Sequence, residues 1–266
     1  MIPIITGADG YIGTNLKYIF DKHEKPYAGL DRKSGPDLLS AEGRDLFEEC
    51  AVTADVVIHL AALPRIPPSW QQPADYIKDN IELTEYVARV CAEQGCHLIY
   101  ASSSSVYGDG DGPLNPYSWT KKAAEDIIRI YGQDNLKYTI CRIFTTYGNN
   151  GPLVLDTWLR KGLKGEPITI HGDGSQSRDF IHVSDVAEAL YSAYLAKLDE
   201  ETLDIGTGQS HKLVDLAGLF GTEIQYAGEQ NGYAHTTQAN AQRTKELLNW
   251  APKHNPKNWI RSNLDT

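Results

Sequence analysis

Short apolar runs alternate with amphipathic stretches through the first half of the chain. Val56, Val57 and Ile58 stand in direct succession, which is typical of a strand buried on both faces, as central strands of parallel sheets are. The longer stretches repeat apolar residues at helical spacing. This alternation predicts an α/β fold with a doubly wound parallel sheet. The expected strands cover residues 2–6, 27–30, 55–60, 97–102 and 138–144, and the expected helices cover residues 11–23, 74–93 and 117–131.

After Gly148 the alternation changes, and the remaining segments do not continue the sheet by simple repetition. We therefore predict one larger domain, residues 1–148 plus about 183–206, and a smaller C-terminal α/β lobe, about residues 149–182 plus 207–266. The expected helices here cover residues 153–163, 185–196, 213–220 and 241–248, and the expected strands cover residues 167–171, 203–205 and 223–226.

Charge and composition exclude several classes of protein. The 266 residues include 25 Lys and Arg against 35 Asp and Glu, a net charge of −10, which argues against a nucleic-acid partner. No apolar run is long enough to cross a bilayer, and the N-terminus lacks a basic segment and cleavage site, so we expect a cytoplasmic protein without a membrane partner. Cys50, Cys91, Cys96 and Cys141 lack metal-ligand spacing, so we expect free thiols and no metal site.

A glycine-rich turn follows the first expected strand and opens the first expected helix. Its glycines, Gly7, Gly10 and Gly13, have the spacing Gly-x-x-Gly-x-x-Gly. They permit a tight turn, a close approach of a diphosphate to the backbone, and close packing of helix on strand. The free N–H groups at the helix N-terminus then face the anion. The segment predicts a dinucleotide site.

Asp31 stands at the end of the second expected strand, where an acid accepts the ribose hydroxyls of adenosine. A carboxylate there repels a 2′-phosphate, which favours NAD over NADP. Arg32 and Lys33 follow directly and oppose that preference.

Hydroxyl groups gather at the end of the strand at residues 97–102, in the run from Ser102 to Ser105. Ligands of parallel sheets bind beyond the carboxyl ends of the strands. Tyr117 and Lys121 follow on the next helix, four residues apart and hence on one face. A nearby ammonium and a positively charged nicotinamide each favour the phenolate, which makes Tyr117 a candidate base for oxidising an alcohol.

Together these residues resemble the extended short-chain dehydrogenase/reductase family, in particular its NAD-dependent nucleotide-sugar epimerases and dehydratases. The likeness covers most of the chain and adds the segments 59–62, 142–148, 172–183 and 244–250. It implies a Rossmann-type fold, a substrate-binding C-terminal lobe and a homodimer, whose interface includes the helices expected at residues 74–93 and 117–131.

The resemblance also implies a mechanism. Tyr117 takes the proton of a sugar hydroxyl, usually at C4, while a hydride passes to NAD⁺, and Lys121 holds the nicotinamide ribose. Ser103 matches the catalytic Ser/Thr position, with Ser104 as its nearest rival. The implied cofactor contacts are Gly7, Gly10, Tyr11, Ile12, Gly13, Asp31, Arg32, Asp37, Leu38, Leu60, Ala61, Ala62, Asn80, Ser102, Tyr117, Lys121 and Phe144.

Substrate contacts are implied for Ser103, Thr145 and Arg178, whose guanidinium suits a diphosphate. Gln230 stands where the family has a second diphosphate-binding arginine. The 108–116 stretch between Tyr107 and Tyr117 is shorter than usual for the family.

The run from Ala101 to Gly108 is most similar to 4-epimerases acting on UDP-hexoses or UDP-hexuronic acids. Dehydratases of the family carry Asp and Glu where Ser104 and Ser105 stand here, which disfavours water elimination. Three alternatives stay open: a nucleotide-keto-sugar reductase, a UDP-glucuronate decarboxylase, and a non-catalytic dinucleotide-sensing or RNA-associated protein.

Overall fold

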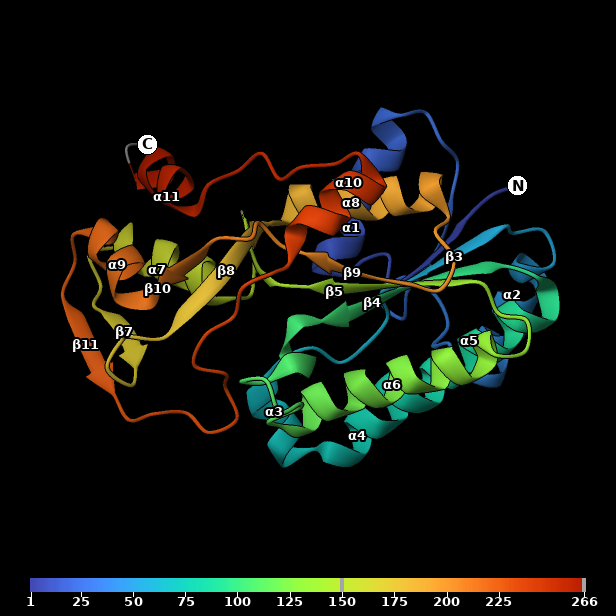
Figure 1. Ribbon diagram of the computed structural model, residues 1–266, viewed down its shortest axis with the longest axis horizontal. Helices are drawn as coiled ribbons and strands as arrows, with labels where there is room; N and C mark the ends of the chain where they lie inside the picture. The colour runs from blue at the N-terminus through green and yellow to red at the C-terminus, as the bar shows by residue number, and fades with distance from the viewer. Residues whose placement is uncertain (149–150, 265–266) are drawn as a thin grey trace.

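The centre of the molecule is a six-stranded parallel sheet (Figure 1). The computed structural model describes residues 1–148 and 151–264. The strand order is β2-β1-β3-β4-β5-β9, so the direction of winding reverses between β1 and β3. This order confirms the predicted doubly wound sheet of Rossmann type. The strands are β1 (Ile4–Thr6), β2 (Ala28–Leu30), β3 (Val56–His59), β4 (His97–Ser103), β5 (Tyr138–Ile143) and β9 (Glu201–Ile205).

Helices cover both faces of this sheet (Figure 1). One face carries α1 (Tyr11–Lys22), α8 (Val183–Ala196) and α10 (Ala241–Leu248), and the other carries α2 (Ala41–Ala51), α5 (Leu83–Gln94) and α6 (Pro116–Gly132). Successive strand residues supply both cores: Ile5 packs on the α1 side and Ile4 on the α5 side. In the described part of the chain, no helix combines the length and apolar character needed to cross a membrane.

The long helix expected at residues 74–93 is interrupted at its centre. It consists of α4 (Pro73–Ile77), a π-helical segment η1 (Lys78–Glu82) and α5. Such segments insert one extra residue into a helix and are frequent at functional sites. Here η1 contains Asn80, whose side chain is fully buried.

A second group of elements packs around Tyr147, Trp158, Phe180 and Trp259. Sequence patterns did not predict the strands at residues 145–147, 177–182 and 210–212 or the helices at residues 41–51, 66–71 and 256–264. The remaining elements are β6 (Thr145–Tyr147), β7 (Ile168–His171), β8 (Ser177–His182), β10 (Ser210–Lys212), β11 (Ile224–Ala227), α3 (Ile66–Gln71), α7 (Val154–Gly162), α9 (Leu213–Ala217), α11 (Pro256–Leu264) and the 3₁₀ segments η2 (Ser104–Tyr107) and η3 (Gly218–Phe220).

The division into two domains stays a prediction. Its expected boundary at residue 149 and its end at residue 266 lie outside the described residues. The segment with α10, which the prediction assigns to the smaller lobe, packs against the larger sheet: Ala241, Leu248 and Trp250 belong to the same core as α1 and α8.

Candidate active site

The turn between β1 and α1 is too tightly packed for side chains. A Cβ on Gly7 would lie 2.7 Å from the Ala61 backbone nitrogen, and one on Gly13 would lie 2.3 Å from the Gly7 carbonyl oxygen. Gly7 also has a φ of +70°, which favours glycine. Among the described residues, no side chain caps α1 at Gly10. The first N–H groups of α1 are therefore left for another acceptor, and the cradle fits the diphosphate of a dinucleotide.

Asp31 lies directly after β2, and two backbone groups fix its carboxylate. Its Oδ2 accepts the Asp9 N–H and its Oδ1 accepts the Lys33 N–H, each at 2.9 Å. Carboxylate oxygens have further lone pairs, so ribose hydroxyls can still donate to them. The position fits the adenosine end of the same dinucleotide.

The predicted contacts that follow Asp31 have partners within the protein. Arg32 Nη1 lies 2.8 Å from Asp79 Oδ2 and 3.9 Å from Asp37 Oδ2. Asp37 also accepts the Leu39 N–H at 2.9 Å, and Leu38 is buried in the core below α2 and α5. The structure thus brings Arg32 and Asp37 together near Asp31, and their cofactor contacts stay predictions.

The loop after β3 forms the opposite wall of the glycine turn. It contains the predicted residues Leu60, Ala61 and Ala62, and Ala61 lies against Gly7. Asn80 fixes the end of this loop: its Oδ1 accepts the Leu63 N–H at 2.7 Å, and its Nδ2 donates to the Leu63 carbonyl at 3.1 Å. The Asn80 amide also donates to Thr120 on α6 at 3.0 Å. Asn80 therefore joins the loop to the helix that carries Tyr117.

Lys121 is a buried ammonium at the carboxyl end of β4. It is 4% exposed, donates to the Ala101 carbonyl at 2.8 Å and lies 4.7 Å from the centre of the Tyr100 ring. Burial lowers the pKa of Lys121 to about 7, and the nearby Glu125 opposes that shift. Because an ammonium has three donors, it can still donate to a cofactor hydroxyl.

Tyr117 stands one turn before Lys121, near the start of α6. Asn115 and Ser118 cap this helix reciprocally, which fixes the position of its first turn. Burial raises the pKa of the Tyr117 phenol, and a hydrogen bond with the Ser103 side chain opposes that shift. The structure therefore brings together the predicted residues Tyr117 and Ser103.

Ser103 and its rival Ser104 differ in their surroundings. The Ser103 hydroxyl accepts the Ser105 N–H at 3.2 Å and the Ser105 hydroxyl at 2.9 Å. Ser104 is buried at the start of η2. Contact with Tyr117 favours Ser103 as the serine of the site.

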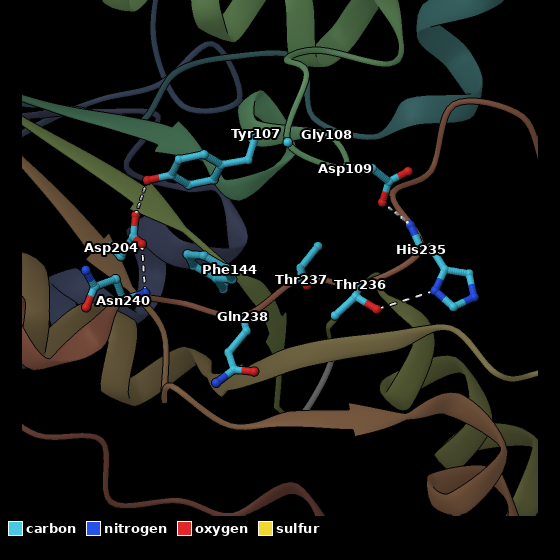
Figure 2. A pocket seen from close by; sticks show the side chains of 11 residues that line it. Tyr107, Gly108, Asp109, Phe144, Asp204, His235, Thr236, Thr237, Gln238 and Asn240 are labelled. Carbon is cyan, nitrogen blue, oxygen red and sulfur yellow. Dashed lines mark hydrogen bonds between the residues drawn. The ribbon is translucent and has the colours of Figure 1, made fainter.

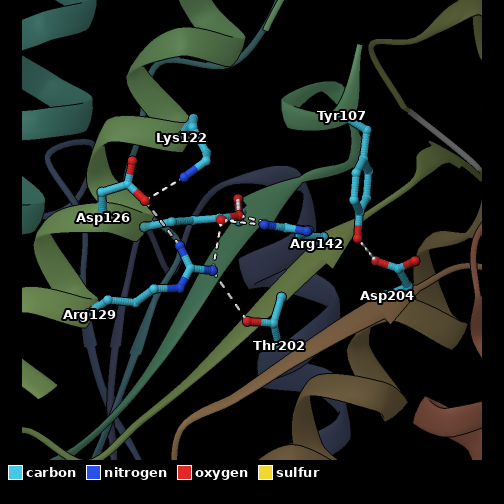
Figure 3. A network of polar contacts seen from close by, with 9 residues as sticks. Tyr107, Lys122, Asp126, Arg129, Arg142, Thr202 and Asp204 are labelled. Carbon is cyan, nitrogen blue, oxygen red and sulfur yellow. Dashed lines mark hydrogen bonds and ion pairs between the residues drawn. The ribbon is translucent and has the colours of Figure 1, made fainter. Parts of the chain in front are cut away.

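Ser102 belongs to a different set of contacts, on the Glu125 side of β4. Its hydroxyl donates to Glu125 Oε1 at 2.6 Å. Glu125 is fully buried on α6 and also accepts two hydrogen bonds from Arg142, at 2.9 and 2.6 Å, and one from Arg129 at 3.1 Å (Figure 3). Burial favours the neutral form of Glu125, but the hydrogen bonds from Arg142 and Ser102 outweigh it and lower the pKa of Glu125, so the carboxylate is ionised. The cofactor contact of Ser102 stays a prediction.

A cavity of about 690 Å³ lies beside the end of β9 (Figure 2). On one wall, Asp204 joins two other lining residues: its carboxylate accepts hydrogen bonds from the Tyr107 hydroxyl at 2.7 Å and from the Asn240 N–H at 2.9 Å. On the other wall, the His235 N–H donates to Asp109 at 2.6 Å. Sequence patterns did not indicate this cavity, since its walls come from distant segments. Of the predicted site residues, Phe144 lines it.

Of the predicted substrate contacts, Thr145 and Arg178 lie on the paired strands β6 and β8, whereas Gln230 lies in a separate hollow. Thr145 begins β6, next to Phe144. Arg178 on β8 is half-buried and donates to the carbonyl oxygens of Ser177 at 2.8 Å and His235 at 2.9 Å. Gln230 lines a hollow of about 350 Å³ against α3. The structure shows no contact that joins Gln230 to Arg178 among the residues it describes.

Two further predicted residues join the turn to neighbouring elements. The Tyr11 hydroxyl donates to the Gly148 carbonyl at 3.0 Å, and Ile12 packs against the core on the α1 side. In residues 1–148 and 151–264, no three His, Cys, Asp or Glu side chains gather as a metal site would require.

The chain is similar in sequence and in structure to known enzymes that act on nucleotide sugars. The profile of the family described as "NAD dependent epimerase/dehydratase family" matches residues 4–206. The chain is 30% identical to "Uncharacterized UDP-glucose epimerase YtcB" of Bacillus subtilis (strain 168), over 94% of this chain and 92% of that protein. It is 28% identical to "UDP-glucuronic acid decarboxylase 1" of Xenopus tropicalis, over 94% and 68%. The structure of "MoeE5 in complex with UDP-glucuronic acid and NAD" is similar, with a TM-score of 0.89 at 30% identity, over 100% of this chain and 98% of that chain.

Proposed function

Because the chain belongs to the NAD-dependent epimerase/dehydratase family, we propose that it inverts C4 of a UDP-hexose or UDP-hexuronic acid through a transient 4-keto sugar. The observation that carries this proposal is the grouping of Ser103, Tyr117 and the buried Lys121 at the carboxyl end of β4. The glycine turn after β1 lies at the same edge of the central sheet, since β1, β3 and β4 run parallel.

In the proposed reaction Tyr117 is the base that takes the proton from the sugar O4. Ser103 donates a hydrogen bond to that oxygen and orients it, a task for which its position beside the phenol is suited. NAD⁺, which the glycine turn and Asp31 would hold, would supply the acceptor for the C4 hydride and the source of its return to the opposite face of the keto sugar. Tyr117 then gives the proton back to O4, so the sugar is neither oxidised nor reduced overall.

Lys121 is proposed to make Tyr117 basic enough for this task. Burial alone raises the pKa of the Tyr117 phenol, so the phenolate needs a compensating positive charge. The same burial lowers the pKa of Lys121 to about 7, and a phenolate beside it would favour the ammonium again. The two groups are therefore expected to titrate as a pair.

Arg178 is the proposed anchor of the nucleotide diphosphate. Its guanidinium contacts two carbonyl oxygens, and burial lowers its pKa. Nearby Asp109 opposes that shift. Both hydrogen bonds use Nη1, so the other N–H groups of this guanidinium can donate to a diphosphate.

The alternatives predict different reactions on the same residues. A keto-sugar reductase consumes reduced cofactor stoichiometrically. A decarboxylase releases CO₂ from a UDP-uronic acid, and the 28% identity to such an enzyme keeps this reading open. A non-catalytic binding protein would not require a buried lysine one helical turn from Tyr117, and we therefore favour an enzyme. The homodimer and the cytoplasmic location stay predictions.

One experiment separates these reactions. Purified protein is incubated with UDP-glucose and with UDP-glucuronic acid, first without added cofactor and then with added NADH, and the products are resolved by chromatography and NMR. The proposal expects the C4 epimer with no net absorbance change at 340 nm. Release of CO₂ or consumption of added NADH in proportion to product would contradict it in favour of the corresponding alternative.

A further inference from the structure

The side chain of Asp9, inside the glycine turn, is surrounded by donors. Its Oδ1 forms an ion pair with Lys17, in the second turn of α1, and its Oδ2 accepts the Ser34 hydroxyl. Lys33 Nζ donates to the Asp9 carbonyl oxygen at 2.9 Å. Lys17 and Ser34 lower the pKa of the Asp9 carboxyl, so it is an anion at neutral pH.

Asp9 also touches the residue that favours NAD. Its backbone N–H donates to Asp31 Oδ2 at 2.9 Å, while Lys33 holds the other Asp31 oxygen through its own N–H. The two carboxylates are thus linked through one short stretch of backbone. Any group added to the ribose that Asp31 holds enters the surroundings of Asp9, Lys17 and Ser34.

An ammonium and a hydroxyl on a small anion, with a second ammonium on the adjacent carbonyl oxygen, are donors of the kind that bind a phosphate. In this protein the anion bound by these donors is the carboxylate of Asp9 itself. Arg32, the remaining nearby cation, is already paired with Asp79 at 2.8 Å. A 2′-phosphate would therefore meet Lys17 and Arg32 already paired with carboxylates, and the negative charges of Asp9 and Asp31 close to its own.

We propose that Asp9 excludes NADP, by occupying the donors of Lys17 and Ser34 that would otherwise bind a 2′-phosphate. Asp31 accepts hydrogen bonds from the hydroxyls of the unmodified ribose, and Asp9 disfavours binding of a ribose that carries a 2′-phosphate. The proposal depends on the proposed function only in placing adenosine at Asp31, and not on the identity of the sugar.

The test compares 5′-AMP with 2′,5′-ADP, which differ only by the 2′-phosphate. Calorimetry on the full chain, freed of nucleotide by charcoal, gives both affinities for wild type, Asp9→Ala and Asp9→Asn. We expect Asp9→Ala to bind 2′,5′-ADP at least 10-fold more tightly than wild type, with 5′-AMP changed by less than about threefold. Asp9→Asn keeps the shape of the turn and should shift the ratio in the same direction.

Two control variants separate this local effect from a general change of charge. Lys17→Met in the Asp9→Ala background should remove the gain. Asp21→Ala removes an acid elsewhere on α1 and should leave the ratio of affinities unchanged.

An unchanged ratio in both Asp9 variants, or an equal gain in Asp21→Ala, overturns the proposal while leaving the proposed reaction intact. A wild-type chain that binds neither nucleotide overturns the placement of adenosine at Asp31, and with it both the cofactor site and this inference.

Discussion

Lys121 donates its hydrogen bond to the carbonyl oxygen of Ala101, 2.8 Å away, so the helix bearing Tyr117 is tied to the end of β4. The ammonium has further N–H groups that can donate to a ligand, and burial lowers its pKa to about 7. In the proposed enzyme this is the charge that stabilises the Tyr117 phenolate.

Replacing Lys121 by Met should therefore change the pH dependence of the reaction. Without the ammonium the pKa of Tyr117 rises, so the fall of kcat/KM on the acid side moves to higher pH. We expect a shift of more than one pH unit and a loss of at least about 100-fold at pH 7. Rate profiles measured from pH 6 to 10 check this. An acid limb at the wild-type position would contradict the assigned role.

Glu125 should matter for stability far more than its neighbour. Glu125→Ala leaves Arg142 buried without its carboxylate, which costs about 3–5 kcal/mol of unfolding free energy. Asp126→Ala, one residue on, removes an exposed carboxylate that pairs with Lys122 and Arg129 and should cost less than about 1 kcal/mol. Urea unfolding measures both. Equal losses in the two variants would argue against the buried network.

Buried histidines should make the protein sensitive to acid. Burial lowers the pKa of His59 to about 3 and the pKa values of His97 and His182 to about 4. Below about pH 6.5 the unfolded chain takes up these protons and the native chain does not, so the free energy of unfolding falls as pH falls. Each such histidine contributes about 1.4 kcal/mol per pH unit.

His97→Gln isolates one of these protons. Between pH 6 and 4.5 the slope of unfolding free energy against pH should be smaller than in wild type by about 1.4 kcal/mol per pH unit. Urea titrations at several pH values give the slope. The same slope in both proteins would show that His97 is protonated in the native state.

Trp119 is the residue with which to test the predicted homodimer. It is 52% exposed on α6, the helix that the resemblance places in a dimer interface. Trp119→Glu should give a monomeric mass by light scattering at micromolar concentration, because a buried charge opposes association. Tyr18→Glu, on α1 across the sheet and 68% exposed, should leave the mass unchanged. A monomeric wild type would refute the dimer itself.

The sequence predicted the central sheet because consecutive apolar residues mark strands buried on both faces. It did not predict α2, since residues 41–51 are rich in charge, although Ser40 caps the helix and Phe47 and Ala51 bury one face of it. It also missed α3, where Pro67 and Pro68 obscure a short helix that Pro can begin.

The site was predictable where its residues follow local spacing, as Tyr117 and Lys121 do. The same four-residue spacing places Glu125 one further turn along this face of α6, so its position near Lys121 follows from the sequence as well. Strand alternation likewise separates Ser102 from Ser103, because neighbouring residues on a strand point to opposite faces. The cavity beside Asp204 had no such signal, since only folding brings Tyr107 and Asn240 to it.

Tyr117→Phe tests the central claim most directly, because it removes one oxygen atom and keeps the ring. Wild type and variant are assayed with the UDP-sugar that wild type converts, and the NAD bound to each is measured after denaturation. The account predicts that the variant retains NAD and loses at least about 1,000-fold in the rate of C4 inversion. A variant with normal NAD content and near wild-type turnover would contradict it.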